Sequence, residues 1–485
     1  MVWQGRSDLF IDGTWVSGSG EALDVVSPTT EEVLARFKAG SPADIDAAVT
    51  AARRAFDDGP WARTSLEERV ALIIELRRLL QEEQESSAQL MTDEMGCPIT
   101  QSRTILAGAP LDIIDAYLDV ARDFPFQEIR SARTGRALVS HEPVGVVAAI
   151  VPWNSPLGIS VQKVVPALLA GCTVVLKPAP QTALTGFLFA ELIERAGFPP
   201  GVVNVVPADR EASEALVVHP GVDKVTFTGS TAAGRRIASL CGHDLRRVSL
   251  ELGGKSAALV LDDADLDQTV EALRMGAFRN SGQVCTLKTR VLVPERHRDE
   301  LVGRLEAMVA SLSVGDPHDE ETQIGPMVTE AQLRRVEGYI AAGCEQGAKL
   351  VTGGGRPAGQ PRGWFVEPTL FSDVGPNMSI AREEIFGPVL SVLSYADERD
   401  AVAIANDTSY GLSGAVFSTD VERGLTIARQ LRTGAVELNG SAIGLGAPFG
   451  GFKESGLGRE NGPEGLSAYT EMRSIGLAPD VEIAL

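Results

Sequence analysis

Five short apolar runs, separated by stretches with helical spacing, occupy the chain between residues 144 and 251. The first run, residues 144–151, is apolar throughout, as a strand buried on both faces requires. The other runs are residues 173–176, 202–206, 224–227 and 247–250, with helices expected near 156–170, 182–196 and 210–218. Strands and helices that alternate at this length predict an α/β fold with a doubly wound parallel sheet. In such a sheet, ligands bind beyond the carboxyl ends of the strands.

A second α/β set follows Glu251. Its expected helices lie near residues 266–281, 296–311 and 329–347, and its expected strands at 290–293, 388–393 and 434–438. Between about 120 and 142 the pattern instead becomes extended, with alternating polar residues, and predicts a ribbon of strands. A ribbon has little core of its own and an exposed edge, so we expect a subunit contact there; a simple surface hairpin explains the pattern equally well.

Charge and cysteine spacing argue against several classes of partner. The 485 residues contain 44 Lys and Arg against 65 Asp and Glu, and the resulting net charge of −21 opposes broad contact with nucleic acid or an anionic membrane. Five cysteines without a CxxC spacing favour neither a disulfide framework nor a zinc site, and they indicate a reducing compartment. The longest apolar runs are too short to span a bilayer. We expect a soluble, cytoplasmic protein with a small-molecule partner and no metal.

Glycines and polar residues follow the strands of the first expected sheet. Residues 228–234 form a glycine turn that leads into a helix, so that N–H groups and the helix dipole can face a phosphate. The spacing of Gly229 and Gly234 also occurs in ordinary tight turns, and it is neither the G-x-G-x-x-G fingerprint nor a P-loop. Lys177, at the end of the second strand, is either a solvated lysine or a donor to a nucleotide ribose. The place of the turn in the sheet favours a nucleotide site.

Cys285 is the candidate nucleophile. A free cysteine is more often a small buried apolar residue, so the interpretation depends on its neighbours. Gly282 lies just before it and Gly253 and Gly254 lie upstream, and glycines permit unusual backbone angles and the close approach of a ligand. Glu251, between an apolar strand and these two glycines, is a candidate general base, although most carboxylates are paired or solvated.

Asn154 has two interpretations. An isolated asparagine at this place usually caps the helix that follows it. If its amide points instead at the carbon beside Cys285, it donates to a developing oxyanion, a contribution of about 3 to 4 kcal/mol per donor. The histidines of the chain share no motif with Cys285, so a Cys-His hydrolase is a poor fit.

Taken together, the motifs resemble the hydrolytic branch of the aldehyde dehydrogenase superfamily, from Leu9 to Leu485. The matching motifs, in chain order, are Pro152-Trp153-Asn154, Lys177-Pro178, Phe227-Thr228-Gly229-Ser230, Glu251-Leu252-Gly253-Gly254-Lys255, Gly282-Gln283-Val284-Cys285, Glu384-Ile385-Phe386-Gly387-Pro388 and Pro448-Phe449-Gly450-Gly451-Phe452-Lys453-x-Ser455-Gly456. So many motifs in one order leave chance matching negligible.

The resemblance implies that an aldehyde is oxidised to its carboxylic acid with hydride transfer to NAD(P). Cys285 would form a thiohemiacetal and then a thioester, and Asn154 and the Cys285 backbone N–H would hold the oxyanion. Glu251 would activate the hydrolytic water. Lys163 and Glu460 are similar to the family's proton-exit residues. The residues that the resemblance assigns to the cofactor are Trp153, Lys177, Gly229, Ser230, Gly234, Leu252, Glu384 and Phe386, with Lys177 at the adenine ribose and Glu384 and Phe386 at the nicotinamide ribose and ring.

Two departures from the family pattern bear on specificity. Many NAD-using members have glutamate where this chain has Pro180, and that carboxylate repels a 2′-phosphate; its absence leaves both NAD and NADP open, with NAD favoured. Ser155, Ile159 and Gln162 stand where some members place aromatic rings around the aldehyde, and residues 444–447 are also small. We expect an open tunnel that accepts more than the shortest aliphatic aldehydes.

The same resemblance predicts the division of the chain. Residues 1–121 and 143–253 would form the dinucleotide-binding domain, 254–454 the catalytic domain, and 122–142 with 470–485 a small β oligomerisation arm of a homodimer or homotetramer. Two other functions are weighed against the leading one. A CoA-acylating semialdehyde dehydrogenase commonly lacks the glutamate present here as Glu251, and a non-catalytic binding protein has no need of Cys285, Glu251 and Asn154 together.

Overall fold

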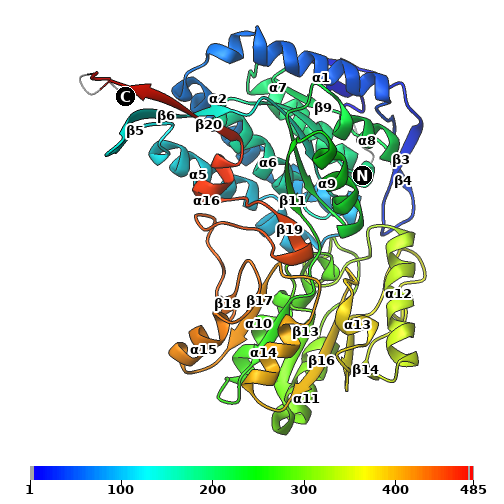
Figure 1. Ribbon diagram of the computed structural model, residues 1–485. Coiled ribbons are helices and arrows are strands. Elements are labelled where there is room, and N and C mark those ends of the chain that lie inside the picture. Colours follow the sequence, from blue (N-terminus) through cyan, green and yellow to red (C-terminus); the bar gives the residue numbers. More distant parts are fainter. Residues whose placement is uncertain (1–4, 479–480, 484–485) are drawn as a thin grey trace.

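The computed structural model describes residues 5–478 and 481–483, and its first lobe is built on an eight-stranded sheet (Figure 1). The parallel core of the sheet consists, in spatial order, of β11 (Arg247–Glu251), β10 (Lys224–Thr228), β7 (Val146–Ile150), β8 (Thr173–Lys177) and β9 (Val203–Val205). The antiparallel edges are the hairpin of β1 (Leu9–Ile11) and β2 (Thr14–Val16) beside β9, and β19 (Gly456–Leu457) beside β11. The predicted doubly wound α/β fold is confirmed.

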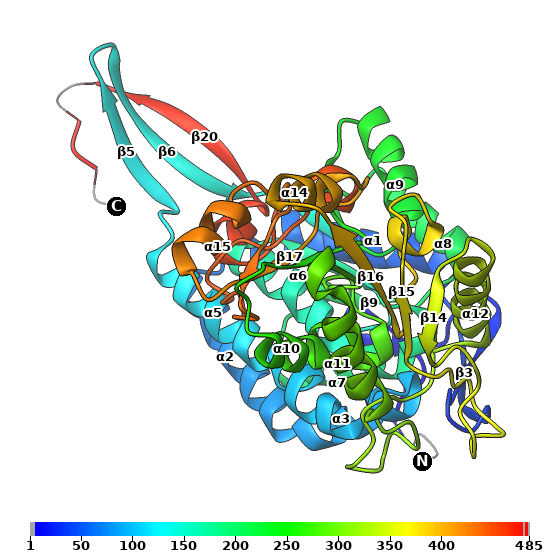
Figure 2. The ribbon, with the colours of Figure 1, turned by 90° about the horizontal axis from the view of Figure 1, so that it is seen from below.

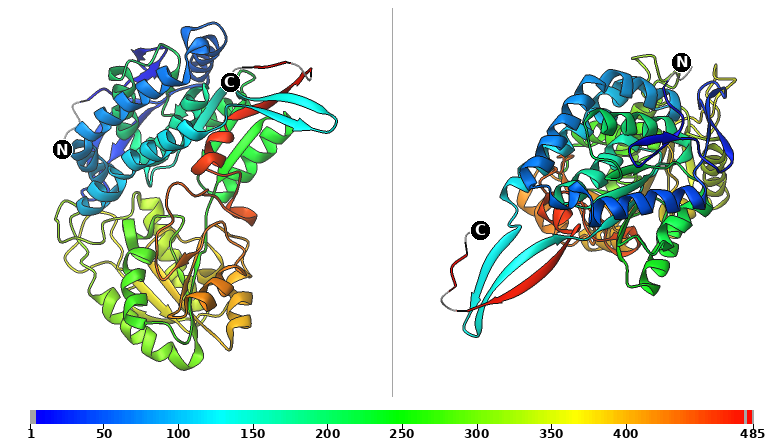
Figure 3. Two further views of the ribbon diagram at one scale, coloured as in Figure 1. Left: turned by 90° about the vertical axis from the view of Figure 1, so that its left-hand side faces the viewer. Right: turned by 90° about the horizontal axis from the view of Figure 1, so that it is seen from above.

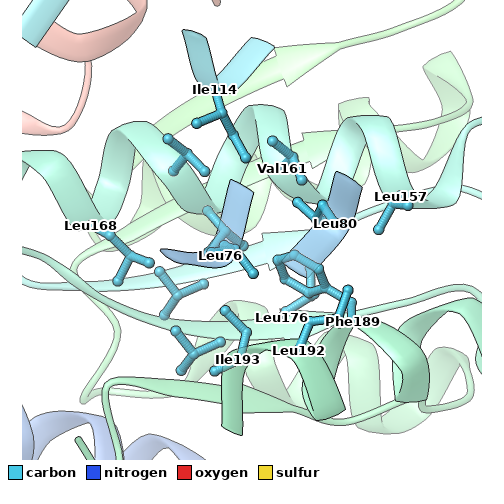
Figure 4. Close-up of a cluster of buried hydrophobic side chains, with 14 of the residues drawn as sticks. Leu76, Leu80, Ile114, Leu157, Val161, Leu168, Leu176, Phe189, Leu192 and Ile193 are labelled. Atoms are coloured by element: carbon cyan, nitrogen blue, oxygen red, sulfur yellow. The ribbon is translucent and has the colours of Figure 1, made fainter. Parts of the chain in front are cut away.

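Helices cover both faces of this sheet, and each face has its own apolar core. The helices of one face are α2 (Leu66–Glu82), α5 (Ala109–Asp123), α6 (Pro156–Ala170) and α7 (Ala183–Arg195), and those of the other are α1 (Pro42–Asp57), α8 (Arg210–Val218) and α9 (Thr231–His243). Figure 4 shows the first core, in which Ile114, Val161 and Phe189 from three helices meet Leu176 of β8. Side chains of β8 alternate between the two cores, since Leu176 belongs to the first and Val175 to the second.

The second lobe contains a seven-stranded sheet. Its spatial order is β14 (Lys349–Thr352), β15 (Thr369–Ser372), β16 (Val389–Tyr395), β13 (Arg290–Pro294), β12 (Ala257–Val260), β17 (Gly414–Phe417) and β18 (Glu437–Leu438). Only β14 runs antiparallel to its neighbour among these described strands. The helices of this lobe are α10 (Leu266–Phe278), α11 (Arg298–Ala310), α12 (Glu330–Glu345), α13 (Ser379–Arg382), α14 (Glu398–Asn406) and α15 (Val421–Ala428). Residues 252–256 join β11 to β12, so the carboxyl end of β11 faces the second lobe.

A three-stranded antiparallel arm projects from the body (Figures 2 and 3). It consists of β5 (Gln127–Ala132), β6 (Gly135–Pro143) and β20 (Thr470–Leu477), which follows the short helix α16 (Gly462–Ser467). The ribbon expected from about residue 120 starts only at Gln127, because α5 continues to Asp123. The C-terminal segment, expected to pair between subunits, pairs with β6 of its own chain. Residues 479–480 and 484–485 of the predicted tail lie outside the described residues.

The remaining elements complete the first lobe. They are the hairpin of β3 (Ala22–Val26) and β4 (Val33–Lys38), and the helices α3 (Gln84–Met95) and α4 (Ile99–Gln101). Among all the helices described, none combines the length and the apolar character that a membrane crossing demands.

Candidate active site

A strained loop carries Cys285. The helix expected to run to residue 281 ends at Phe278, because Asn280 and Ser281 adopt left-handed backbone angles, with φ of 50° and 55°. Gly282 continues the run with φ of 79°. Left-handed angles are costly for residues that have a β-carbon, so two of them in succession must be held by the surrounding structure.

Buried polar contacts from distant segments hold this loop. The Asn280 N–H donates to Gln101 Oε1 of α4 at 2.7 Å. The Ser281 hydroxyl donates to the carbonyl of Gly325 and accepts from its N–H, both at 2.9 Å. Gln283 Oε1 accepts from the N–H of Val328 at 3.0 Å. Asn280 and Ser281 thus each have a partner outside the loop. The sequence alone did not indicate Gln101, and it assigned no role to Ser281 or Gln283.

Close backbone packing explains two of the motif glycines. A β-carbon on Gly282 would collide with the backbone of Gly387 and Pro388. A β-carbon on Gly254 would lie 2.5 Å from the carbonyl oxygen of Cys285. The motif that contains Glu251 and the motif that contains Phe386 are therefore both in direct contact with the loop that carries Cys285.

Asn154 lies against the same loop, buried at the start of α6. The side-chain Nδ2 of Asn154 donates to the backbone carbonyl of Gln283 at 3.0 Å. The backbone carbonyl of Asn154 accepts from Asn280 Nδ2 at 3.1 Å. It makes no capping bond to α6, so the helix-cap interpretation is wrong. Because an amide nitrogen has two hydrogens, Asn154 retains a second donor beside the loop that carries Cys285.

Glu251 is the last residue of β11 and is 3% exposed. Neither carboxylate oxygen has a hydrogen-bond partner among the described residues. Burial, and then the nearby Glu460, raise the pKa of Glu251 well above its usual range, while Lys163 and Arg459 oppose the shift. A carboxyl group held dry and unpaired in this way is a strong base once it is ionised.

Burial raises the pKa of the Cys285 thiol to about 12, and the carboxylates of Glu384 and Glu251 add to the shift. Arg279 acts in the opposite direction and favours the thiolate. Arg279 lies on the strained loop, six positions before the cysteine, and its guanidinium donates to Thr286 Oγ1 at 3.4 Å. The sequence motifs did not indicate this cation, because its charge acts through space rather than through a recognised spacing.

Glu384 and Phe386 lie across from Glu251 on the second lobe. Glu384 Oε1 accepts from the Gly254 N–H at 3.0 Å. Burial raises the pKa of Glu384, and the Gly254 hydrogen bond opposes the shift. The Phe386 ring meets the Trp153 ring edge-on, with centroids 5.3 Å apart. Phe386 also has a φ of 62°, a third strained residue in addition to Asn280 and Ser281.

A pocket of about 570 Å³ opens at the carboxyl ends of β7, β8 and β10. Lys177, Pro180 and Ser230 are among its walls, and Ser230 caps the N-terminus of α9 by accepting from the Ala233 N–H at 3.3 Å. Burial lowers the pKa of Lys177 to about 8, while Asp209 opposes the shift.

Three of the expected cofactor residues do not line this pocket. Gly229, Gly234 and Leu252 are not among the described residues of its walls. The Gly229 N–H donates to the Glu251 carbonyl at 3.0 Å, and Gly234 packs directly against the Leu252 side chain. These contacts stabilise the turn of residues 228–234.

Lys163 and Glu460 form a buried ion pair behind Glu251. The two charged atoms, Lys163 Nζ and Glu460 Oε1, are 2.5 Å apart. Lys163 Nζ also donates to Thr226 Oγ1 at 3.1 Å. The structure thus brings together all three expected catalytic residues, the two residues expected at the nicotinamide, Glu384 and Phe386, and this ion pair.

Comparison with known proteins decides the family. Residues 15–475 match the model of the aldehyde dehydrogenase family. The chain belongs to that family. Geranial dehydrogenase of Castellaniella defragrans is 44% identical to this aldehyde dehydrogenase over 469 residues, which are 96% of this chain and 98% of that protein. This aldehyde dehydrogenase therefore oxidises an aldehyde to a carboxylic acid with hydride transfer to NAD(P), and the predicted family and enzyme class are confirmed.

Solved structures agree with this assignment over the whole fold. An aldehyde dehydrogenase of Mycobacterium tuberculosis, complexed with NAD+, has a TM-score of 0.96 at 45% identity, covering 98% of this chain and 99% of that one. A mutant of aldehyde dehydrogenase C of Pseudomonas syringae, complexed with NAD+ and octanal, has a TM-score of 0.96 at 41% identity, covering 99% of each chain.

Proposed function

We propose that Cys285 carries the acyl group and that Glu251 activates the water that hydrolyses it. The observation that supports this most is the Glu251 carboxylate, which is buried, unpaired and within electrostatic reach of the Cys285 thiol. A general base must be dry enough to be basic and free enough to accept a proton. A carboxylate with a merely structural role would be hydrogen-bonded at this depth.

The protein residues divide the chemistry into two steps. The Cys285 thiolate attacks the aldehyde carbon, and the second N–H of Asn154 and the backbone N–H of Cys285 hold the oxyanion. After loss of hydride, a thioester remains on Cys285. Glu251 then takes a proton from water as the water oxygen attacks the thioester carbon, the carbon–sulfur bond breaks, and the acid leaves. Covalent catalysis of this kind replaces one hard step with two easier ones.

The pocket at Lys177 fits a dinucleotide. It combines an ammonium group, the N-terminus of α9 capped by Ser230, and a volume of about 570 Å³. Lys177 would bind the adenine ribose, Ser230 and Trp153 would lie along the cofactor, and Glu384 and Phe386 would hold the nicotinamide ribose and ring. Gly229, Gly234 and Leu252 would shape the turn beneath it. When bound, the nicotinamide supplies the hydride acceptor.

NAD is the proposed preferred cofactor, and NADP is accepted as well. The complexes of the Mycobacterium tuberculosis and Pseudomonas syringae enzymes contain NAD+. Pro180 lines the pocket near Lys177 and has no charge to repel a 2′-phosphate. Discrimination between the two cofactors should therefore be modest.

The proposed substrates are apolar aldehydes of medium length. The related proteins are named for geranial or contain octanal. Ile159 of α6 and Leu445 are apolar, partly buried side chains packed against the core of the first lobe. A β-carbon added to the exposed Gly444 or Gly446 would meet no atom within 4 Å, so bulk at these positions does not oppose a chain longer than that of the shortest aldehydes.

The proposed domains are 1–121 with 143–253 for the dinucleotide, 254–454 for catalysis, and 122–142 with 470–485 as the oligomerisation arm. The two main sheets and the separate arm sheet support this division. We place the enzyme in the cytoplasm as a homodimer or homotetramer. All five cysteines lie in the described chain and are unpaired, which suits a reducing compartment.

A panel of aldehydes tests the function. Purified enzyme is mixed with aldehydes from acetaldehyde to decanal and benzaldehyde, with NAD or NADP and without CoA, while nicotinamide reduction is followed by absorbance and the product by mass. We expect carboxylic acids, rates that rise with chain length, and higher rates with NAD. Reduction that requires CoA and yields acyl-CoA would establish the alternative branch, and poor turnover of every bulky aldehyde would refute the open tunnel.

Two variants test the residue roles. Cys285→Ala should abolish turnover and leave NAD affinity nearly unchanged. Glu251→Gln should retain the first burst of nicotinamide reduction but slow steady-state turnover by about 100-fold or more, with a thioester detectable by intact mass. Steady-state turnover at the normal rate in either variant contradicts the mechanism.

A further inference from the structure

A polar stripe crosses the buried parallel sheet beneath Glu251. Parallel strands covered on both faces normally have apolar side chains on both faces. Here the paired positions of β10 and β11 are Lys224 with Arg247, Thr226 with Ser249, and Thr228 with Glu251. Residues two apart on a strand share a face, so these six side chains project together. The intervening Val225, Phe227 and Leu250 belong to the apolar core of the opposite face.

The stripe makes contact with the Lys163–Glu460 ion pair at its middle. Lys163 reaches Thr226 Oγ1 from α6 at 3.1 Å. The buried Tyr469, which lies just before β20, is close enough to Thr226 for the two side chains to interact. Near Glu251, the Thr228 hydroxyl is buried without a partner among the described residues, as are both Glu251 oxygens. Unpaired polar atoms at this depth are the places where bridging water lies.

At the amino end of the stripe is a second buried lysine that the proposed mechanism does not use. Lys224 is 3% exposed, and its Nζ donates to Ser249 Oγ at 2.8 Å. The same Nζ lies 5.3 Å from the centroid of the Tyr469 ring. Arg247, the residue of β11 paired with Lys224, is at the surface, where it forms an ion pair with Glu471 of the arm at 2.5 Å. Lys224 is therefore the last interior group before solvent.

We propose that Lys224 is the outer end of the route by which the proton of thioester hydrolysis leaves the enzyme. The inference rests on the proposed function of Glu251. The proton taken from water by Glu251 passes to the Glu460–Lys163 pair, and Lys163 hands a proton to the Thr226 hydroxyl. Ser249 lies opposite Thr226, one strand spacing of about 4.8 Å away, within reach of a hydroxyl or water relay. Lys224 accepts the proton from Ser249 and releases one to solvent, so that one proton enters and one leaves.

The ionisation of Lys224 agrees with this role. Burial lowers its pKa to about 8, so the amine can both take and release a proton near neutral pH. The groups that face it from the surrounding elements are Cys172, Lys163, Glu460, Glu471 and Tyr469. A lysine needed only as a fixed charge would instead be paired with a carboxylate; the hydrogen bond that it makes here goes to a hydroxyl.

The test compares variants that separate proton exchange from packing. Lys224→Met keeps the aliphatic stem, Lys224→Arg keeps the charge but cannot deprotonate, and Ser249→Ala removes the hydroxyl next to the lysine. The matched control is Ser391→Ala, another buried serine, from β16 of the second lobe. Each protein is assayed by burst kinetics, steady-state rate, deuterium solvent isotope effect and rescue by added methylammonium.

We expect all three stripe variants to retain the burst amplitude and the KM for NAD while kcat falls about tenfold, the isotope effect increases and methylammonium restores part of the rate. Ser391→Ala should behave like the wild type. Full activity in folded Lys224→Met, recovery of activity in Lys224→Arg, or parallel loss of burst and kcat would overturn the proposal. If Lys224→Met does not fold, Ser249→Ala decides by the same criteria. Absence of a thioester in Glu251→Gln would refute the function itself, whereas a thioester there with unimpaired stripe variants would refute only the relay.

Discussion

The reactivity of Cys285 is set by a small number of charges. Its raised pKa means that most of the enzyme has a neutral thiol near pH 7, although the thiolate is the nucleophile. The thiolate fraction therefore rises by about tenfold per pH unit below the pKa. Glu384 and Glu251 work against the thiolate, and Arg279 favours it.

Substitution of these neighbours should move thiol reactivity in opposite directions. Arg279→Met removes the favourable charge and should slow alkylation of Cys285 by iodoacetamide several-fold, whereas Glu384→Gln should accelerate it. The measurement is the alkylation rate of the cofactor-free enzyme between pH 7 and 9, resolved by peptide mass. The exposed Cys344 serves as the internal control in every sample. Shifts of the same sign in both variants would show that these charges do not govern the thiol.

At the scale of elements, the loop of residues 279–282 links the fold to the site, because it fixes the position of the chain just before Cys285. Its left-handed angles turn the chain sharply after α10, so that the loop contacts Asn154 and Cys285 comes within electrostatic reach of Glu384. The strain of Asn280 and Ser281 is offset by hydrogen bonds to Gln101, to Gly325 and to the side chain of Gln283. Because several hydrogen bonds fix this loop, Cys285 has little freedom to change its position.

Gly282→Ala should therefore destabilise the fold and the site together. The new β-carbon meets the Gly387 backbone at a φ of 79°, and we expect a loss of about 1–3 kcal/mol in the free energy of unfolding by urea, with slower Cys285 alkylation. The control is Gly303→Ala in α11, where an added β-carbon meets no atom within 4 Å and should stabilise by about 0.5–1 kcal/mol. Equal stability of the two variants would contradict the strain argument.

The same loop shows what the sequence could and could not predict. Apolar periodicity located the strands and helices of the first sheet to within a residue or two, because buried strands and helices have distinct patterns. It extended α10 to residue 281, because it does not register the tertiary contacts from Gln101 and Gly325 that turn the backbone. The motifs located Cys285, Glu251 and Asn154, but the influence of Arg279 and the stripe ending at Lys224 depend on distances that only the fold provides.

At the scale of the whole molecule, the site is assembled from both lobes. Glu251 and Asn154 belong to elements of the first lobe, and Cys285 and Glu384 to the second. Residues 252–256 join the sheets directly, and β19 returns to pair with β11. Tyr469 lies between α16 and the arm strand β20, and its ring packs against Lys224. A displacement of β20 would therefore change the contact between Tyr469 and Lys224, at the amino end of the polar stripe.

The arm is also the proposed surface for self-association. Its outer strand β20 exposes Met472 at 66% and Ile475 at 46%, and β20 and β5 each have one edge without a strand partner in the described chain. An exposed apolar edge of this kind favours pairing with another copy. We expect Met472→Lys with Ile475→Lys to reduce the mass in solution from an oligomer to a smaller species, because each added charge would have to be desolvated on assembly. Multi-angle light scattering measures the mass, and Leu245→Lys, on a residue 85% exposed outside the arm, is the control. An unchanged mass in the double variant would place the subunit contact elsewhere.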